Sequence, residues 1–286
     1  MGGGMAARLL ESGWRVRVCD LDPDRTRALA ALGATVCGTP AECAADCLAL
    51  IVCVVDAAQV DAVLFGEGGA AQQLHPGQDV LLCPTIAPQD VERFAGRLQD
   101  KGVFAIDAPM SGGPVRARDG SMSLMLAGAD AALQRQQALV DTLSNKAFRI
   151  SARPGDGART KLVNNLLAGI NLVGVAEAIA LAERLGLAAE RTLSVIEQSS
   201  GQSWIGSDRM RRAIAGDFEP HAHMTLLEKD TGLALRAAAA AGFQGPLGAA
   251  AHTVFALACA AGLAGLDDGA LLQYLRGTTA PPAADP

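Results

Sequence analysis

The sequence is poor in aromatic residues and in charge, and it contains no block of basic residues. Aromatic side chains make up 3% of the 286 residues and charged side chains 19%, and the formal net charge is −6. Stacking surfaces for bases are therefore scarce, and nothing in the chain attracts a phosphate backbone or an anionic lipid surface. We expect no nucleic-acid partner and no membrane partner.

A secretory signal and long uncharged apolar runs are also missing. The start, MGGGMAARLLESG, has no basic region followed by an apolar core, and no run combines the length and the lack of charge of a membrane span. The seven cysteines are odd in number and scattered through apolar stretches, which is typical of free thiols in a reducing compartment. These features predict a cytoplasmic protein.

Hydrophobic residues make up 50% of the chain, and their spacing changes near residue 155. Before that point, apolar runs such as CLALIVCVV (47–55) and DVLLCPT (79–85), typical of strands buried on both faces, alternate with helical patterns. After it, only helical patterns remain. The order predicts an α/β domain with a doubly wound parallel sheet over 1–154 and an all-α domain over 155–286. We expect the tail, TTAPPAADP (278–286), to be disordered.

The stretch GDGARTKLVNNLLAGINLVGVAEAIALAERLG (155–186) is predicted to form one long helix. Apolar residues recur in it at steps of three or four, and Asp156 is the predicted N-cap. Lys161 and Asn165 are four residues apart and share one helix face. An amine near a helix N-terminus, with an amide beside it, suits general acid–base work. Alternatively, Lys161 extends to solvent and Asn164 and Asn165 make local caps.

The N-terminal region carries part of a glycine and acid signature. A Rossmann fold begins with a strand, G-x-G-x-x-G and a helix, and about 20 residues later an acid binds the ribose of a dinucleotide. Asp20 ends a predicted strand, and Gly2 fits the third glycine. The first strand would then lie upstream of Met1, through either a misplaced start codon or a truncated, impaired copy. The sheet is predicted to lack its first strand, and the chain to bind NAD poorly.

Three stretches carry a family resemblance: DAPMSGGPVRARDGSMSLMLAG (107–128), GDGARTKLVNNLLA with AEAIALAERLGL (155–187), and LLEKDTGLAL (226–235). Together they resemble the β-hydroxyacid dehydrogenase family, which includes 3-hydroxyisobutyrate dehydrogenase and tartronate semialdehyde reductase and is related to 6-phosphogluconate dehydrogenase. The similarity runs from MGGGMAARLLESG to about Arg276. GQSWIGSDRM (201–210) and GDFEP (216–220) resemble most the L-threonate dehydrogenase branch.

The resemblance implies roles for individual residues. The family's catalytic Lys falls on Lys161, and its substrate-orienting Asn falls on Asn165. In the family an SGG segment cradles the substrate carboxylate, and glycines let backbone N–H groups approach an anion. Substrate contacts are therefore predicted for Ser111, Gly112, Gly113 and Asn164.

The resemblance also implies the contacts of a nicotinamide cofactor. The Thr beside the nicotinamide falls on Thr85, and the family's Lys-Asp pair falls on residues 229–230. Asp20 accepts hydrogen bonds from a free ribose and repels a 2′-phosphate, so NAD is preferred over NADP. Asp56 stands where a Pro is frequent and is expected to repel the cofactor phosphates. Cofactor contacts are predicted for Gly2, Asp20, Val55, Asp56, Thr85, Lys229 and Asp230.

Other polar and aromatic residues have competing interpretations. Trp204 and Arg209 are expected on the helical domain near the cleft. Alternatively, Trp204 is a core aromatic and Arg209 is a solvated helix charge. His221 and His223 form an H-x-H pair before a predicted helix, but no metal is needed if Lys161 is the acid–base group, so we expect no metal site.

The sequence favours an NAD(P)-dependent dehydrogenase of small hydroxy acids, such as L-threonate or another four-carbon sugar acid. Alternatives are a 3-hydroxyisobutyrate dehydrogenase, a tartronate semialdehyde reductase, a non-catalytic truncated homologue, and an imine reductase, against which the presence of Lys161 argues. A homodimer or homotetramer is expected, because the stretches 157–186 and 237–262 are too apolar to be left in water.

Overall fold

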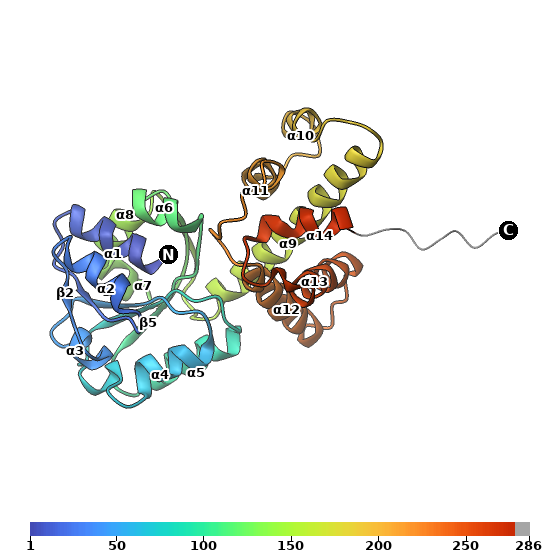
Figure 1. Cartoon of the computed structure of the whole chain (residues 1–286). Coiled ribbons are helices and arrows are strands. Elements are labelled where there is room, and N and C mark those ends of the chain that lie inside the picture. Colours follow the sequence, from blue (N-terminus) through green and yellow to red (C-terminus); the bar gives the residue numbers. More distant parts are fainter. Residues whose placement is uncertain (278–286) are drawn as a thin grey trace. The chain divides into compact units, whose positions relative to one another are not determined.

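The computed structural model describes residues 1–277, which form two compact units (Figure 1). The first unit spans Met1–Lys161, and the second begins at Leu162. The division falls inside one helix, α9 (Asp156–Arg184). The tail predicted to be disordered, 278–286, lies outside the described residues.

The strands of the first unit pair into two sheets. β1 (Arg17–Val18) and β2 (Thr35–Val36) form a parallel pair, with Val18 opposite Val36. The larger sheet has the order β3-β4-β5-β7-β6, and β8 pairs with β7. Its strands are β3 (Ala49–Val52), β4 (Asp79–Leu82), β5 (Phe104–Asp107), β6 (Met110–Ser111), β7 (Ser123–Ala127) and β8 (Lys146–Ser151). In the described chain no strand pairing joins the two sheets, as expected of a sheet interrupted between its halves.

The larger sheet is mixed, which corrects the prediction of an all-parallel sheet. β3, β4 and β5 are parallel, but β7 runs antiparallel to both β5 and β6. Ser111 of β6 lies opposite Ser123 of β7, and the helix between them, α6 (Gly113–Asp119), is short. The chain therefore reverses as in a hairpin instead of crossing over the sheet, as parallel pairing would require.

Helices cover both faces of the larger sheet. Along β4, Leu81 packs in one apolar cluster with Met5, whereas Val80 and Leu82 pack in another with Phe94. Side chains of a strand point alternately to the two faces, so this sheet is buried on both sides. The helical elements are α1 (Gly2–Glu11), α2 (Pro23–Ala30), α3 (Pro40–Ala44), α4 (Ala57–Phe65), η1 (Ala70–Gln72), α5 (Pro88–Gln99), α7 (Asp130–Arg135) and α8 (Gln137–Leu143).

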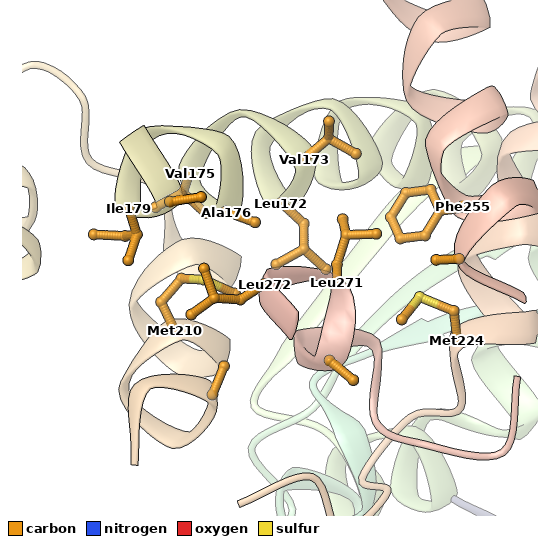
Figure 2. Close-up of a cluster of buried hydrophobic side chains, with 14 of the residues drawn as sticks. Leu172, Val173, Val175, Ala176, Ile179, Met210, Met224, Phe255, Leu271 and Leu272 are labelled. Carbon is orange, nitrogen blue, oxygen red and sulfur yellow. The ribbon is translucent and has the colours of Figure 1, made fainter. Parts of the chain in front are cut away.

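The second unit is helical around one apolar core. Figure 2 shows Leu172 and Ile179 of α9 facing this core together with Met210, Phe255 and Leu271. Phe255 and Leu271 are fully buried, which holds the long helix against the others. Its further elements are α10 (Ala189–Glu197), α11 (Trp204–Ile214), α12 (Met224–Ala240), α13 (Pro246–Ala258), η2 (Cys259–Leu263), η3 (Asp268–Ala270) and α14 (Leu271–Gly277).

The sequence analysis found no run with the length and lack of charge of a membrane span, and two helices of the structure correct this. Asp156–Arg184 and Pro246–Leu263 are each long and apolar enough to cross a membrane by length and composition alone. In α9, half of the most apolar window is buried inside the protein, where it forms the core of the second unit. On the same helix Val163 is 71% exposed and Leu167 is 57% exposed. Assembly into a dimer or tetramer, and a cytoplasmic location, stay predictions.

Candidate active site

The N-terminus of α1 lies at the carboxyl end of β3. A Cβ atom added to Gly2 would lie 3.2 Å from Cβ of Cys53, the residue after β3. A Cβ at Gly4 would lie 3.0 Å from the carbonyl oxygen of Pro114, so glycine there lets α1 approach α6. No side chain caps α1, and the first N–H groups of a helix have no partner within it. This end of α1 therefore suits an anion such as a pyrophosphate.

Asp20 follows β1, and its carboxylate can accept more hydrogen bonds than it does in this structure. Its side chain is 41% exposed. One carboxylate oxygen accepts a hydrogen bond from the backbone N–H of Asp22 (2.9 Å), and the other lies 4.0 Å from Nη1 of Arg25. An ionised carboxylate has about four acceptor positions, so it can still bind the two hydroxyls of a ribose.

Asp56 caps a helix. Its carboxylate accepts a hydrogen bond from the backbone N–H of Gln59 (2.8 Å), and Oε1 of Gln59 accepts one from the backbone N–H of Val55 (2.9 Å). This reciprocal pair resembles a capping box at the start of α4, with the N–H of the residue before the N-cap as the second donor. Helix capping therefore explains why this chain has Asp56 where a Pro is frequent in the family.

Val55 and Thr85 follow neighbouring strands. Val52 of β3 lies opposite Leu82 of β4 in parallel register, so the residues that follow them emerge at the same edge of the sheet. Gly2 lies at this edge too, beside Cys53. The carboxyl edge of the strands is where open α/β sheets bind their ligands.

The SGG segment forms a turn that requires glycine. Gly112 has a φ of 128° and Gly113 a φ of 74°, both in the left-handed region that side chains disfavour. A Cβ at Gly112 would also lie 2.7 Å from Cδ of Arg116. Ser111 precedes the turn on β6, and the three residues are half-buried.

Lys161 lies near the start of α9, and its side chain is buried, with 6% of its surface exposed. The helix begins against the carboxylate of Asp107, whose Oδ2 accepts hydrogen bonds from the backbone N–H groups of Gly155 (2.8 Å) and Ala158 (2.9 Å). Burial raises the pKa of Asp107 to about 6, although these hydrogen bonds act in the opposite direction.

Asp156, the predicted N-cap of α9, has other partners. Its Oδ2 accepts a hydrogen bond from the hydroxyl of Ser151 (2.7 Å), and its carboxylate pairs with Arg153 and Arg159. The cap is supplied by Asp107, which sequence analysis left without a role. The sequence feature that could have indicated this role is an acid at the very end of the apolar strand VFAID (103–107).

Asn165 belongs to a buried polar network of the second unit. Its Nδ2 donates a hydrogen bond to Oδ2 of Asp230 (2.6 Å), and its Oδ1 accepts one from Nδ2 of Asn164 (3.0 Å). Nζ of Lys229 lies 3.0 Å from Oδ1 of Asp230. Because both ends of its amide are held, Asn165 has one defined orientation. The Lys-Asp pair predicted from the resemblance is thus placed beside the predicted substrate-orienting Asn.

Arg209 is buried, contrary to the expectation of a solvated charge. It is 8% exposed, and its Nε donates a hydrogen bond to Oδ1 of Asp268 (2.5 Å) and lies 3.7 Å from Asp267. Trp204 is 47% exposed at the start of α11 and is not a core residue. Within residues 1–277 no group of three or more His, Cys, Asp or Glu side chains could hold a metal ion.

Both halves of the chain match known family models. Residues 1–151 match the NAD binding domain of 6-phosphogluconate dehydrogenase. Residues 155–275 match a domain described as NAD-binding of NADP-dependent 3-hydroxyisobutyrate dehydrogenase. These matches confirm a Rossmann-type nucleotide domain followed by a helical domain.

Individual proteins are similar over their full length. L-threonate dehydrogenase of Cupriavidus necator is 36% identical, over 100% of this chain and 96% of its own. The protein of that name from Escherichia coli K12 is 38% identical over 99% and 94%. The crystal structure of a 3-hydroxyisobutyrate dehydrogenase from Salmonella typhimurium has a TM-score of 0.90 at 35% identity, covering 96% of this chain and 95% of the other. The chain therefore belongs to the β-hydroxyacid dehydrogenase family, on its L-threonate dehydrogenase branch.

Proposed function

We propose that this protein oxidises L-threonate or a closely related four-carbon sugar acid with NAD as the hydride acceptor. Family membership makes it a nicotinamide-dependent oxidoreductase that acts on CH–OH donors. The observation that supports the proton chemistry is the buried Lys161 on α9, with the fixed amide of Asn165 one helical turn further along. The choice of L-threonate is supported by the relatives that carry this name.

Lys161 supplies the proton chemistry. In oxidation its amine accepts the proton of the substrate hydroxyl, and in reduction its ammonium returns that proton. Asn165 orients the hydroxyl, and Asp230 prevents the amide from turning over. A nicotinamide cofactor bound to the first domain would supply the hydride acceptor for the same carbon. The backbone N–H groups of Ser111, Gly112 and Gly113 hold the substrate carboxylate.

The first domain, 1–154, fits a dinucleotide. The uncapped start of α1 at Gly2 suits the pyrophosphate, and the half-exposed carboxylate of Asp20 suits the adenosine ribose. Val55 and Thr85 stand at the sheet edge where the cofactor extends. The helical domain, 155–286, contributes Lys161, Asn164 and Asn165 to the substrate site. It also contributes Lys229 and Asp230 to the cofactor site.

A panel of acids tests the proposal. NADH absorbance is followed with L-threonate, D-glycerate, 3-hydroxyisobutyrate and 6-phosphogluconate, with NAD in large excess. We expect the highest kcat/KM with L-threonate. We expect no turnover of 6-phosphogluconate, because Lys161 is the only cation among the proposed substrate residues and phosphate recognition favours clustered Arg and Lys. A preference for 3-hydroxyisobutyrate would identify the second candidate activity, and inactivity with every acid would contradict both.

Asp20 is predicted to select NAD over NADP. In Asp20→Asn the charge that repels a 2′-phosphate is lost and the acceptor for the ribose is weakened. We expect KM for NAD to rise about 10-fold, because a hydrogen bond to a charged group contributes about 1.5 kcal/mol or more. KM for NADP is expected to fall. The control is Asp22→Asn, which changes a nearby acid that caps α2. An unchanged ratio of the two KM values in Asp20→Asn would refute this role.

A further inference from the structure

Asp107 connects a strand end to the start of the long helix. It is the last residue of β5 and is 1% exposed. Its Oδ2 accepts hydrogen bonds from two backbone N–H groups, those of Gly155 and Ala158, at the start of α9. The first N–H groups of a helix otherwise have no partner when buried, so this carboxylate determines where α9 begins.

The first turn of α9 has almost no freedom to shift. A Cβ atom added to Gly157 would lie 2.7 Å from the carbonyl oxygen of Met125 and 2.9 Å from Cγ of Asp107. Gly155 has a φ of 101°, which only glycine adopts without strain. The backbone is thus in direct contact with the end of β5 and with the middle of β7, and small residues are required for that contact.

Two parts of the candidate site are linked to Asp107 by short segments of the chain. Ser111, the first residue of the SGG segment, is four residues after it in the chain. Lys161 is four residues, or about one helical turn, after Gly157. We infer that Asp107 is a positioning residue, which sets the height of the first turn of α9 and thereby holds Lys161 in place relative to the SGG segment. The inference rests on the proposed function of Lys161.

The charge of Asp107 controls how well it holds the helix. An ionised carboxylate oxygen accepts two N–H groups more strongly than a protonated one does, and its negative charge is favourable at a helix N-terminus. Because burial raises the pKa of Asp107 to about 6, the cap weakens as the pH falls through that value. Other titratable or charged groups in this region are Asp156, Arg153, Arg159, Glu92, Cys83 and Lys161.

Most of these groups already have partners. Asp156 pairs with Arg153 and Arg159, and Glu92 also pairs with Arg159. Burial raises the pKa of Cys83 well above its ordinary value, so the thiol stays neutral near pH 6. Asp107 is therefore the group whose protonation is expected to disturb the first turn of α9 on the acid side of neutrality.

The test is Asp107→Asn, which keeps the shape of the side chain and removes its charge. Since small misplacements of a reacting group cost up to about 100-fold, we expect kcat with L-threonate to fall about 10- to 100-fold, with KM for NAD within about twofold of wild type. The pH profile is measured in the reduction of the oxidised acid, where Lys161 acts as an ammonium. There kcat of the wild-type enzyme should decline below an apparent pKa near 6, and this decline should be absent from the variant.

The matched control is Asp79→Asn. Asp79 is also 1% exposed in the same sheet, where its carboxylate binds Arg135 and Gln136 and not α9. Both variants should lower the melting temperature, but Asp79→Asn should keep the wild-type kcat and its acid decline. Wild-type kcat and an unchanged pH profile in Asp107→Asn would overturn the inference.

Two further measurements separate this inference from the proposed function. Lys161→Ala, assayed in parallel, must lose at least about 100-fold in kcat; if its kcat is close to that of wild type, the proposed function itself fails. If Asp107→Asn does not fold, the wild-type profile of the reduction still decides, because Lys161 acts there as an ammonium and stays active at acid pH. A kcat of reduction that is flat from about pH 5 to 8 overturns the role of Asp107 while leaving that of Lys161 intact.

Discussion

Replacing Lys161 by alanine is expected to lower kcat for the hydroxy acid by about 10²–10⁴-fold, the usual contribution of a general acid–base group. The nearby polar residues, Asn164 and Asn165, are amides and cannot take the hydroxyl proton. The fold should be retained, because alanine is the strongest helix former and Lys161 is inside α9. The measurement is kcat from NADH absorbance at saturating acid and cofactor, with circular dichroism to verify the helix content.

The control for this variant is Lys101→Ala. Lys101 is exposed and follows α5, so the same chemical change there should leave kcat unchanged. A Lys161→Ala enzyme with near-wild-type kcat would show that the proton is moved by another group. A Lys161→Ala protein without helical signal would not decide the matter, and Lys161→Met, which keeps the length of the side chain, would then take its place.

Replacing Arg209 by alanine is expected to destabilise the protein by about 3–5 kcal/mol, the usual cost of leaving a buried charge without its partner. Arg209 is 8% exposed and faces two buried carboxylates, Asp267 and Asp268. Without it, Asp268 loses its hydrogen-bonded counter-charge. Urea unfolding followed by circular dichroism gives the free energy of unfolding.

Arg27 of α2 provides a control whose ion pair is exposed. Its side chain is 76% exposed and pairs with Asp24, which is 79% exposed, so Arg27→Ala should change the free energy of unfolding by at most about 1 kcal/mol. Equal, small effects of the two variants would contradict a structural role for the buried cluster around Arg209.

The effect of Arg209→Ala should depend on pH. Burial, opposed by Arg209, raises the pKa of Asp268 from 3.8 to about 7 in the folded protein. A folded-state pKa above the unfolded value means that this group stabilises most at acid pH, and that the contribution is lost as the pH rises towards 7. The penalty for removing Arg209 is therefore larger above about pH 8, where Asp268 is charged, than near pH 5.

Local patterns predicted most of the elements but not their partners. Apolar periodicity is a property of neighbouring residues, so strands such as Asp79–Leu82 and the long helix Asp156–Arg184 could be placed from sequence. The direction of β7 could not, because it depends on pairing with β6 and β5. The role of Asp56 was predictable in principle, since its partner Gln59 is three residues away.

The buried charges were the least predictable part of the site. Asp107 caps α9 through Gly155, 48 residues away in sequence, and Arg209 binds Asp268, 59 residues away. An isolated acid or arginine in a sequence looks like a solvated charge, and only the fold brings its partner to it. The candidate site residues predicted by resemblance, such as Lys161 and Asn165, needed a family pattern because spacing alone left a capping role open.

Transfer of a deuterium label tests the central claim most directly. The protein is incubated with NAD and L-threonate that carries deuterium at every hydroxyl-bearing carbon, and the reduced cofactor is analysed by mass spectrometry. If the protein moves a hydride from a hydroxyl-bearing carbon to the nicotinamide, each reduced cofactor will contain a deuterium taken from the acid, and Lys161→Ala will form it far more slowly. Reduced cofactor without deuterium, or no reduction at all, would contradict the account.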